Sequence, residues 1–392
     1  MVNANHAIRS DYGSANRPHV SEWFGHRVFP VVSHSPASLD DQLKHACPFL
    51  SNALGSVQRC VKSDETDKTK RNSAGVCTIS STSNGPRQDW LVCPYRALDS
   101  RLMIDMVRRL FSVPASTPVV VRPALILASA DARTSFLDKV GNPETRTFLY
   151  FQGKLGGEIG LPKTPASPAM SFDVTVVEIL PGSQAALSIL SFGETAVRLG
   201  KYGVIELQTT DTHGSYRQTV EALTNALNLH PANFHEQLAE NPEWAGKKVE
   251  GPNVSNVFKR TFYQVAFKFQ ATKRDSSVGC ILVLPKPVWD SWQPFLGAPE
   301  LKKAADGTYR FADDESTSSS DWIYVFDVAA QSEDGAPARL AVDIVLGTSA
   351  AQLSRAALDV APRRAVEGQG QADAVVTSLR RRLRANLPGL EA

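Results

Sequence analysis

The sequence predicts an α/β fold, and three observations lead to this expectation. Residues 170–180 and 202–210 alternate apolar and polar side chains with a period of two, which is typical of strands. In residues 254–270, apolar residues recur at helical spacing. Apolar runs at 280–289 and 322–328 predict further strands after this helix. Strands that alternate with helices favour a sheet covered by helices.

The remaining elements follow from the same periodicities. Asp99 is a suitable N-cap for a helix with apolar positions at Leu102, Met106 and Leu110. Further elements are expected, in chain order, as a helix from about Asp131, a buried strand at 147–152, a helix from about Ser215 to Leu227, and a helix-compatible run at 379–384.

The chain divides by composition into three regions. Residues 1–100 hold four of the five cysteines and few periodic apolar runs, so this region is expected to need a staple. Residues 101–350 carry the predicted α/β core, and residues 351–392 form a tail rich in Ala, Arg and Gly. With 392 residues and 42% hydrophobic residues, the chain can build a sizeable core.

Composition also excludes several classes of protein. Forty-two Lys and Arg against 40 Asp and Glu give a net charge of +2, so binding to nucleic acid would need a local basic surface. The longest apolar stretches, at 118–121 and 124–128, fall far short of the roughly 20 residues that span a bilayer. The first residues lack the apolar segment of a secretory signal, so a reducing cytoplasm is expected. Five cysteines in that compartment argue against a disulfide framework.

Two of the predicted strands carry acidic residues. Glu206 and Gln208 lie on one side of their strand, and Asp173 belongs to the other strand. If the strands are neighbours, the two carboxylates can hold Mg²⁺, which prefers oxygen ligands and can activate water for attack on a phosphodiester. The alternative is that these side chains line a solvated strand face.

Four cysteines, Cys47, Cys60, Cys77 and Cys93, are separated by 13, 17 and 16 residues. Four thiolates can bind a metal ion in a tetrahedral cage and so organise a polar segment. The close Cys-x-x-Cys pairs of common zinc fingers are missing. The alternative is four buried, inert thiols, and Cys280, at the head of an apolar strand, is expected to be a core residue.

Basic and aromatic residues near these segments are candidates for contacts to DNA. The candidates are Lys259 and Arg260 on the helix at 254–270, His213, Tyr216 and Arg217 just after the Glu206 strand, and Arg380, Arg381, Arg382 and Arg384 in the tail. Each also has a simpler interpretation as part of a solvated helix face, a turn or a solvated tail.

Taken together, several blocks of the sequence resemble the NotI family of type II restriction endonucleases. They occur in one order between about residues 20 and 330, and they are WFGHRVFP (23–30), ACPFL (46–50), CVK (60–62), GVC (75–77), DWLVCPYRALD (89–99), YFQGKLGGE (150–158), SFD (171–173), YGVIELQTTDTHGSY (202–216) and EGPNVSNVFKRTFYQVAFKF (250–269). The tail beyond about residue 350 carries little of the resemblance.

The resemblance implies a PD-(D/E)xK nuclease core, a mixed sheet flanked by helices, that cuts duplex DNA with Mg²⁺. It implies that Asp173 and Glu206 bind the catalytic metal and that Gln208 stands where most relatives of this fold have lysine. Glu158 would sit on a preceding helix as an additional acidic ligand in a two-metal arrangement. Cys47, Cys60, Cys77 and Cys93 match a four-cysteine structural site for iron, with zinc as the alternative.

Members of this family cut GC-rich palindromes, which implies a homodimer that places one catalytic centre on each strand. A cognate DNA methyltransferase would be a further partner, and the bacterial cytoplasm the expected location. The chain departs from the family pattern at 180–200 and around 62–74, so its recognition sequence is not expected to be identical.

Two alternative functions remain open from the sequence. One is a sequence-specific DNA-binding protein that does not cut, in which the acidic residues are structural. The other is a nickase or repair nuclease of the same fold. The cluster of like charges formed by Asp173 and Glu206 is costly and favours cleavage over binding alone.

Overall fold

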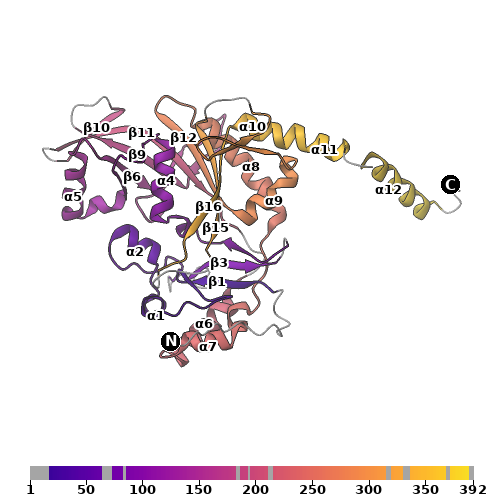
Figure 1. Cartoon of the computed structure of the whole chain (residues 1–392), viewed down its shortest axis with the longest axis horizontal. Coiled ribbons are helices and arrows are strands. Elements are labelled where there is room, and N and C mark those ends of the chain that lie inside the picture. The colour runs from indigo at the N-terminus through magenta and orange to yellow at the C-terminus, as the bar shows by residue number, and fades with distance from the viewer. Residues whose placement is uncertain are drawn as a thin grey trace.

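A large mixed sheet dominates the computed structural model of the chain (Figure 1). The structure describes residues 17–63, 73–82, 85–181, 186–192, 195–210, 215–314, 319–329, 336–367 and 371–387. The ten strands of this sheet run in the order β13 (Leu301–Lys303), β14 (Tyr309–Phe311), β16 (Leu340–Thr348), β15 (Asp321–Val328), β12 (Ser277–Pro285), β11 (Thr195–Leu207), β9 (Val174–Leu180), β6 (Arg146–Phe151) and β5 (Val119–Pro123), with β10 (Ser188–Phe192) also paired to β11.

Strand directions within this sheet are mixed. The pairs β11 with β12, β12 with β15, β5 with β6 and β14 with β16 are parallel, and the other neighbours are antiparallel. The expected α/β fold with a mixed sheet flanked by helices is therefore confirmed.

Helices cover both faces of the sheet, and each face has its own buried cluster. On one face, α4 (Ser100–Leu110) packs with Ile205 and Leu207 of β11. On the other face, α8 (Val254–Ala271) and α9 (Lys286–Leu296) pack with Val204 and with Leu282 of β12. The alternation predicted for 202–210 is confirmed as far as Leu207, where β11 ends, and it directs Glu206 toward α8.

The first hundred residues form a separate four-stranded sheet in the order β2 (His26–Arg27), β1 (His19–Trp23), β3 (Val76–Ser81) and β4 (Gln88–Leu91). Helices from the middle of the chain complete its core, since Trp23 packs against Phe234. The helices around it are α1 (Pro36–Leu43), α2 (Pro48–Leu54), η1 (Pro94–Ala97), α6 (Arg217–Leu229), α7 (Phe234–Glu240) and η3 (Pro242–Gly246), and Figure 1 shows α6 and α7 at the lower end of the molecule.

A buried ion pair joins the small sheet to the large one. Arg96 donates from Nε and Nη2 to the carboxylate of Glu22, at 2.8 and 3.0 Å, and both side chains are fully buried. Although burial alone would raise the pKa of Glu22, the charge and hydrogen bonds of Arg96 lower it below its usual value. Arg96 also donates to the carbonyl of Ala338, shortly before β16. Arg27 donates to the carbonyl of Ala329, directly after β15, at 2.8 Å, so both arginines bind backbone next to the large sheet.

Most predicted elements lie where the sequence places them. The helix predicted at 99–112 is α4, and the side chain of Asp99 caps it by accepting from the backbone N–H groups of Arg101 and Leu102. The helix expected from about Asp131 is α5 (Ala130–Val140), and the short helix η2 (Ala124–Ala128) precedes it. Cys280 is fully buried in the core, as expected.

Three expectations are wrong in detail. The strand predicted at 280–289 ends at Pro285, because Pro287 stands in the first turn of α9, where a missing N–H costs nothing. Phe172 does not share the cluster of Val174, because the chain bends at Asp173 between β8 (Met170–Phe172) and β9. Within the stretch 180–200, the described residues form the hairpin of β10 and β11, so the strand that carries Glu206 begins as early as Thr195.

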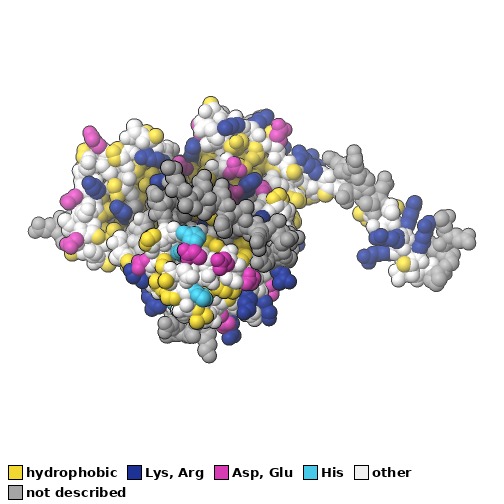
Figure 2. Space-filling view, turned by 60° about the horizontal axis from the view of Figure 1, so that its bottom comes forward, with side chains coloured by type: hydrophobic (Ala, Val, Ile, Leu, Met, Phe, Trp, Pro, Cys, Tyr) yellow, Lys and Arg dark blue, Asp and Glu magenta, His cyan; other side chains and the backbone are white. Residues whose placement is uncertain are grey.

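The C-terminal helices α10 (Ala350–Arg355) and η4 (Ala356–Val360) pack on the body of the molecule through Ala350, Leu353 and Ala356. The helices α11 (Ala361–Glu367) and α12 (Gln371–Asn386) project away from it (Figure 1). Figure 2 shows Lys and Arg side chains gathered on this projection, and α12 carries Arg380, Arg381, Arg382 and Arg384. No helix within the described ranges is long and apolar enough to span a membrane.

Candidate active site

The two predicted carboxylates meet at one edge of strands β9 and β11. Asp173 lies in the bend between β8 and β9, and its Oδ2 accepts from the backbone N–H of Leu207 at 2.9 Å. The backbone N–H of Asp173 is 3.4 Å from Oε1 of Glu206. The antiparallel pairing of β9 with β11 places Val174 opposite Ile205, so the register of the sheet brings these carboxylates together.

Both carboxylates open into a cavity of about 240 Å³ between the sheet and helix α8. Its strand side is formed by Asp173, Glu206 and the segment 207–209. Polar residues also line the helix side, and they are Asn253, Arg260, Thr261, Gln264 and Lys268. We call this cavity the acidic cleft.

Glu206 is the most buried acid of the acidic cleft, with 5% of its surface exposed. Burial and the charge of Asp173 raise the pKa of Glu206 well above its usual value, while Lys268 opposes this rise. Nζ of Lys268 donates directly to Oε2 of Glu206, and Lys268 is itself 5% exposed. The acidic cleft therefore holds two carboxylates close together, one of them shielded from water, and the ammonium group of Lys268 offsets part of their negative charge.

Gln208 also lines the acidic cleft, and its side chain is held at both ends. Oγ1 of Thr261 donates to Oε1 of Gln208 at 2.6 Å, and Nε2 of Gln208 donates to the carbonyl of Thr209 at 2.5 Å. The backbone N–H of Gln208 continues the ladder to β12 by donating to the carbonyl of Val283 at 2.9 Å. The amide is thus fixed on the wall of the cleft, where it can orient a neighbour by hydrogen bonds but carries no charge.

The donor set of the acidic cleft suits a hard divalent cation in part. Two carboxylates, one of them buried with a raised pKa, would be relieved by a bound cation, and Mg²⁺ commonly takes one or two carboxylates and keeps several waters. Within the described residues, no group of three or more His, Cys, Asp or Glu side chains is arranged to hold a metal ion. Asp173 and Glu206 would therefore hold Mg²⁺ with water as the remaining ligands.

Glu158 does not lie on a helix, so this expectation from the resemblance is wrong. Residues 153–157 form a turn in which Gly153, Gly156 and Gly157 all have positive φ, a backbone conformation that ends regular helix. Glu158 follows as an exposed residue just before β7 (Ile159–Leu161), and it is not part of the lining of the acidic cleft. Ile159 pairs with Phe172 in the ladder of β7 and β8. Glu158, just before Ile159, and Asp173, just after Phe172, therefore lie at the same end of this ladder.

The structure separates the candidates for DNA contacts. Arg260 lines the acidic cleft, whereas Lys259, its exposed neighbour on α8, does not. Tyr216 is half-buried at the start of α6, and the exposed Arg217 pairs with Glu221 at 2.7 Å. His213 lies outside the described residues.

The apolar periodicity of the helix at 254–270 does not reveal the roles of Thr261, Gln264 and Lys268. It marks the buried apolar side of α8 and gives no sign that a lysine is buried as well. Thr261, Gln264 and Lys268 are three and four residues apart, which places them on one side of the helix. This polar stripe beside an apolar one was the signal that could have identified the wall of the cleft.

Strand pairing brings the four N-terminal cysteines together. The antiparallel bridge between Ala46 and Arg59 places Cys47 and Cys60 on adjacent backbone segments, diagonally across the bridge. The hairpin of β3 and β4 brings Cys77 opposite Val92, the residue before Cys93, since the N–H of Val92 donates to the carbonyl of Cys77 at 3.1 Å. All four cysteines line one small cavity, the cysteine pocket, with Tyr95 and Gly75 among their neighbours, although their side chains as placed are not grouped to hold a metal ion. The long sequence spacings thus reflect two hairpin-like pairings.

Two of these cysteines share a local structure. Cys47 and Cys93 each precede a proline and stand at the N-cap of a short helix, although neither side chain makes a capping hydrogen bond. Burial and the neighbouring thiols raise the pKa of Cys47 to about 12, and burial also raises the pKa of Cys77 and of Cys93. A metal ion would have to displace these protons, because only thiolates bind metal.

A scan of the chain against protein-family models gives no match, and a search of curated proteins gives none either.

Proposed function

We propose that this chain is a Mg²⁺-dependent type II restriction endonuclease that cuts double-stranded DNA at a GC-rich palindromic site. The observation that carries the proposal is the meeting of Asp173 and Glu206 in the acidic cleft, with Arg260 and Lys268 on the opposite wall. A PD-(D/E)xK core is part of the proposal, and the mixed sheet with carboxylates from two neighbouring strands supports it.

Different side chains of the acidic cleft have different roles in the proposed hydrolysis of a phosphodiester. Asp173 and Glu206 hold Mg²⁺, which supplies activation of water and stabilisation of the negative charge on the reacting phosphate. Arg260 faces the same cleft and offers a guanidinium suited to a phosphate oxygen. Gln208, fixed by Thr261, limits the positions that a water or phosphate oxygen can occupy beside the carboxylates.

The second part of the proposal concerns the cysteine pocket. Cys47, Cys60, Cys77 and Cys93 bind a structural iron ion, or zinc, since a tetrahedral set of four sulfurs suits both metals. Backbone N–H groups near Cys47 and Cys93 offset part of the rise in pKa that burial causes in these thiols, and a bound metal ion would supply the rest of the stabilisation that a thiolate needs. Metal analysis and the visible absorption of the purified chain test this part, and a chain purified without either metal would contradict it.

The proposed partners follow from the palindromic site. Two copies of the chain are needed to place one acidic cleft on each strand, and a DNA methyltransferase would protect the host sites. Size measurement of the chain on a GC-rich duplex tests the first of these expectations.

The direct test is digestion of unmethylated GC-rich plasmid DNA with Mg²⁺, followed by sequencing of the ends. We expect Asp173→Asn and Glu206→Gln each to lower the cleavage rate by about 10³-fold or more, since each removes a charged ligand of the cation. Asp275→Asn, at an exposed acid beyond the end of α8, is the matched control and should cut at the wild-type rate.

Two outcomes would contradict the proposal. Full cleavage by Asp173→Asn would remove the acidic cleft from the reaction. Specific retention of DNA without Mg²⁺-dependent cutting would instead assign the chain to the class of DNA-binding proteins that do not cut.

A further inference from the structure

Among the described residues that line the acidic cleft, those on the strand side include no basic side chain. Position 208 is occupied by a neutral glutamine whose carbonyl oxygen already accepts from Thr261 and whose amide nitrogen already donates to the carbonyl of Thr209. This side chain cannot compensate the charges of Asp173 and Glu206. Any positive charge contributed by the protein must come from another element.

Helix α8 brings such a charge to the same carboxylate from the opposite wall. Nζ of Lys268 donates to Oε2 of Glu206, and both side chains are almost completely buried. Oε1 of Glu206 faces the backbone N–H of Asp173 instead. Lys268 therefore holds one oxygen of the carboxylate and leaves the other on the side of Asp173.

The surroundings explain why Lys268 stays in this place. Its neighbours on α8, Val265 and Phe269, are buried in the core, so the aliphatic part of Lys268 packs there while its ammonium group reaches the cleft. A buried ammonium without a partner is costly, and Glu206 is the acid that partners it. The contact thus fixes Lys268 and Glu206 relative to each other.

The charges of the cleft limit the number of metal ions that it can take. Asp173 and Glu206 carry two negative charges, and the opposite wall carries two positive ones, on Arg260 and on Lys268, of which Lys268 pairs directly with Glu206. One Mg²⁺ can bind at the two carboxylates, whereas a second one would lie near these cations without a further acidic ligand among the lining residues.

From this geometry we propose that Lys268 is the positioning residue that replaces the missing strand lysine and takes the place of a second metal ion, so that the acidic cleft binds one Mg²⁺. The inference rests on the proposed function. Lys268 orients Glu206 through Oε2 and places a fixed positive charge beside the site where the phosphate reacts. In doing so it also competes with Mg²⁺ for Glu206.

The test compares Lys268→Met with the wild-type chain in two measurements. In the first, Mg²⁺ alone is titrated into the full-length, DNA-free chain by calorimetry. We expect one Mg²⁺ per wild-type chain and about tenfold tighter binding in Lys268→Met, because a competing cation has been removed. In the second, cleavage of GC-rich plasmid at saturating Mg²⁺ should fall about 10²-fold in Lys268→Met, because the fixed charge is lost.

Tighter Mg²⁺ binding together with slower cleavage distinguishes the proposed role of Lys268 from that of a purely structural ion pair. A role in folding alone would weaken Mg²⁺ binding and cleavage together. Lys268→Arg keeps the charge and should bind Mg²⁺ within about threefold of the wild type. Lys273→Met is the matched control, since it makes the same substitution at an exposed lysine just beyond α8, and it should change neither measurement.

The failures of the two proposals can be told apart. Absence of plasmid cutting by the wild-type chain would overturn the proposed function, while the titrations would still decide the role of Lys268. Mg²⁺ binding that is no tighter in Lys268→Met, wild-type cleavage by that variant, or two Mg²⁺ ions per wild-type chain would each overturn the inference. The wild-type stoichiometry decides the matter if Lys268→Met does not fold.

Discussion

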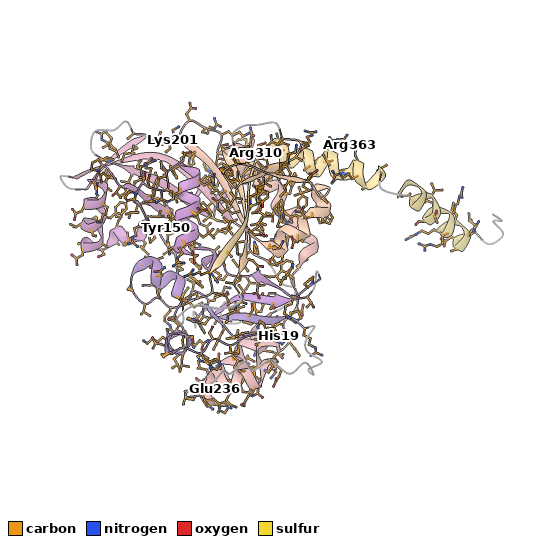
Figure 3. The ribbon with its side chains drawn as sticks, viewed as in Figure 1. His19, Tyr150, Lys201, Glu236, Arg310 and Arg363 are labelled. Carbon is orange, nitrogen blue, oxygen red and sulfur yellow. The ribbon has the colours of Figure 1, made fainter. Side chains whose placement is uncertain are left out.

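At the scale of single residues, two buried histidines make the stability of the fold depend on pH. His19 lies on β1 in the lower part of the molecule, and Figure 3 labels it together with Glu236 of α7. His235 precedes Glu236 on the same helix. Burial lowers the pKa of each from 6.5 to about 4, with smaller effects from nearby groups. Both rings are therefore neutral in the folded chain at neutral pH.

The sign of the effect follows from linkage. A lowered pKa in the folded state means that the unfolded chain takes up protons first as the pH falls. The contribution of the two histidines is fully present above pH 6.5 and is lost as the pH falls toward about 4. We expect the double variant His19→Gln, His235→Gln to lose less stability than the wild type across this interval.

Urea unfolding of both chains at several pH values between 6.5 and 4 measures this difference. The comparison is needed because buried acids change in the opposite direction, since burial raises the pKa of Asp321 to about 6. Parallel curves for the two chains would show that the histidines contribute nothing.

Residue chemistry alone could not identify Lys268. The period of two predicts that Glu206 and Gln208 share one side of their segment, and the family resemblance adds Asp173 to them. A lysine that enters the same site from a helix more than sixty residues later follows no such period. Its burial depends on how α8 lies on the sheet, which is a property of the packed fold.

At the scale of elements, the sequence predicts strands and helices well where one periodicity holds over a whole element. Helix α4 agrees with its prediction because Asp99 and an apolar stripe mark both its start and its face. A turn precedes Glu158 in place of the helix that the family resemblance implies, because Gly153, Gly156 and Gly157 adopt positive φ. The bend at Asp173 likewise places Phe172 in the opposite core from Val174.

Helix α12 illustrates an element that the folded body does not need. Its described side chains are exposed, including Val375 at 60% and Leu379 at 55%. We expect removal of residues 371–392 to change the free energy of unfolding by no more than about 0.5 kcal/mol, because little apolar surface is buried by this segment. Urea unfolding of the shortened chain measures this. A clear loss of stability would mean that α12 folds back on the body in solution.

At the scale of the whole molecule, the two sheets depend on the ion pair of Glu22 with Arg96. Glu22→Gln would leave the buried guanidinium without a counter-charge, so we expect a loss of roughly 3–5 kcal/mol in the free energy of unfolding. The matched control is Asp40→Asn, which makes the same kind of change in the exposed pair with Lys44 and should cost at most about 1 kcal/mol. Equal losses in the two variants, measured by urea unfolding, would contradict this prediction.

The overall assembly was the part that the sequence could predict least. The first hundred residues look too polar to fold alone, and the structure shows that α6 and α7 supply the missing apolar surface. Contacts such as Trp23 with Phe234 join segments about two hundred residues apart, and no local pattern specifies them. The polar composition predicts a staple for this region, and the structure shows that packing against later helices stabilises it.

One backbone hydrogen bond connects the two candidate sites. The N–H of Thr210, two residues beyond Gln208, donates at 2.7 Å to the carbonyl of Leu91, two residues before Cys93. A chain that loses order around its cysteines would release this tether, and the exit of β11 would lose a fixed anchor. We therefore expect damage to the thiols to disturb the end of β11, and with it the wall of the acidic cleft, through this one contact.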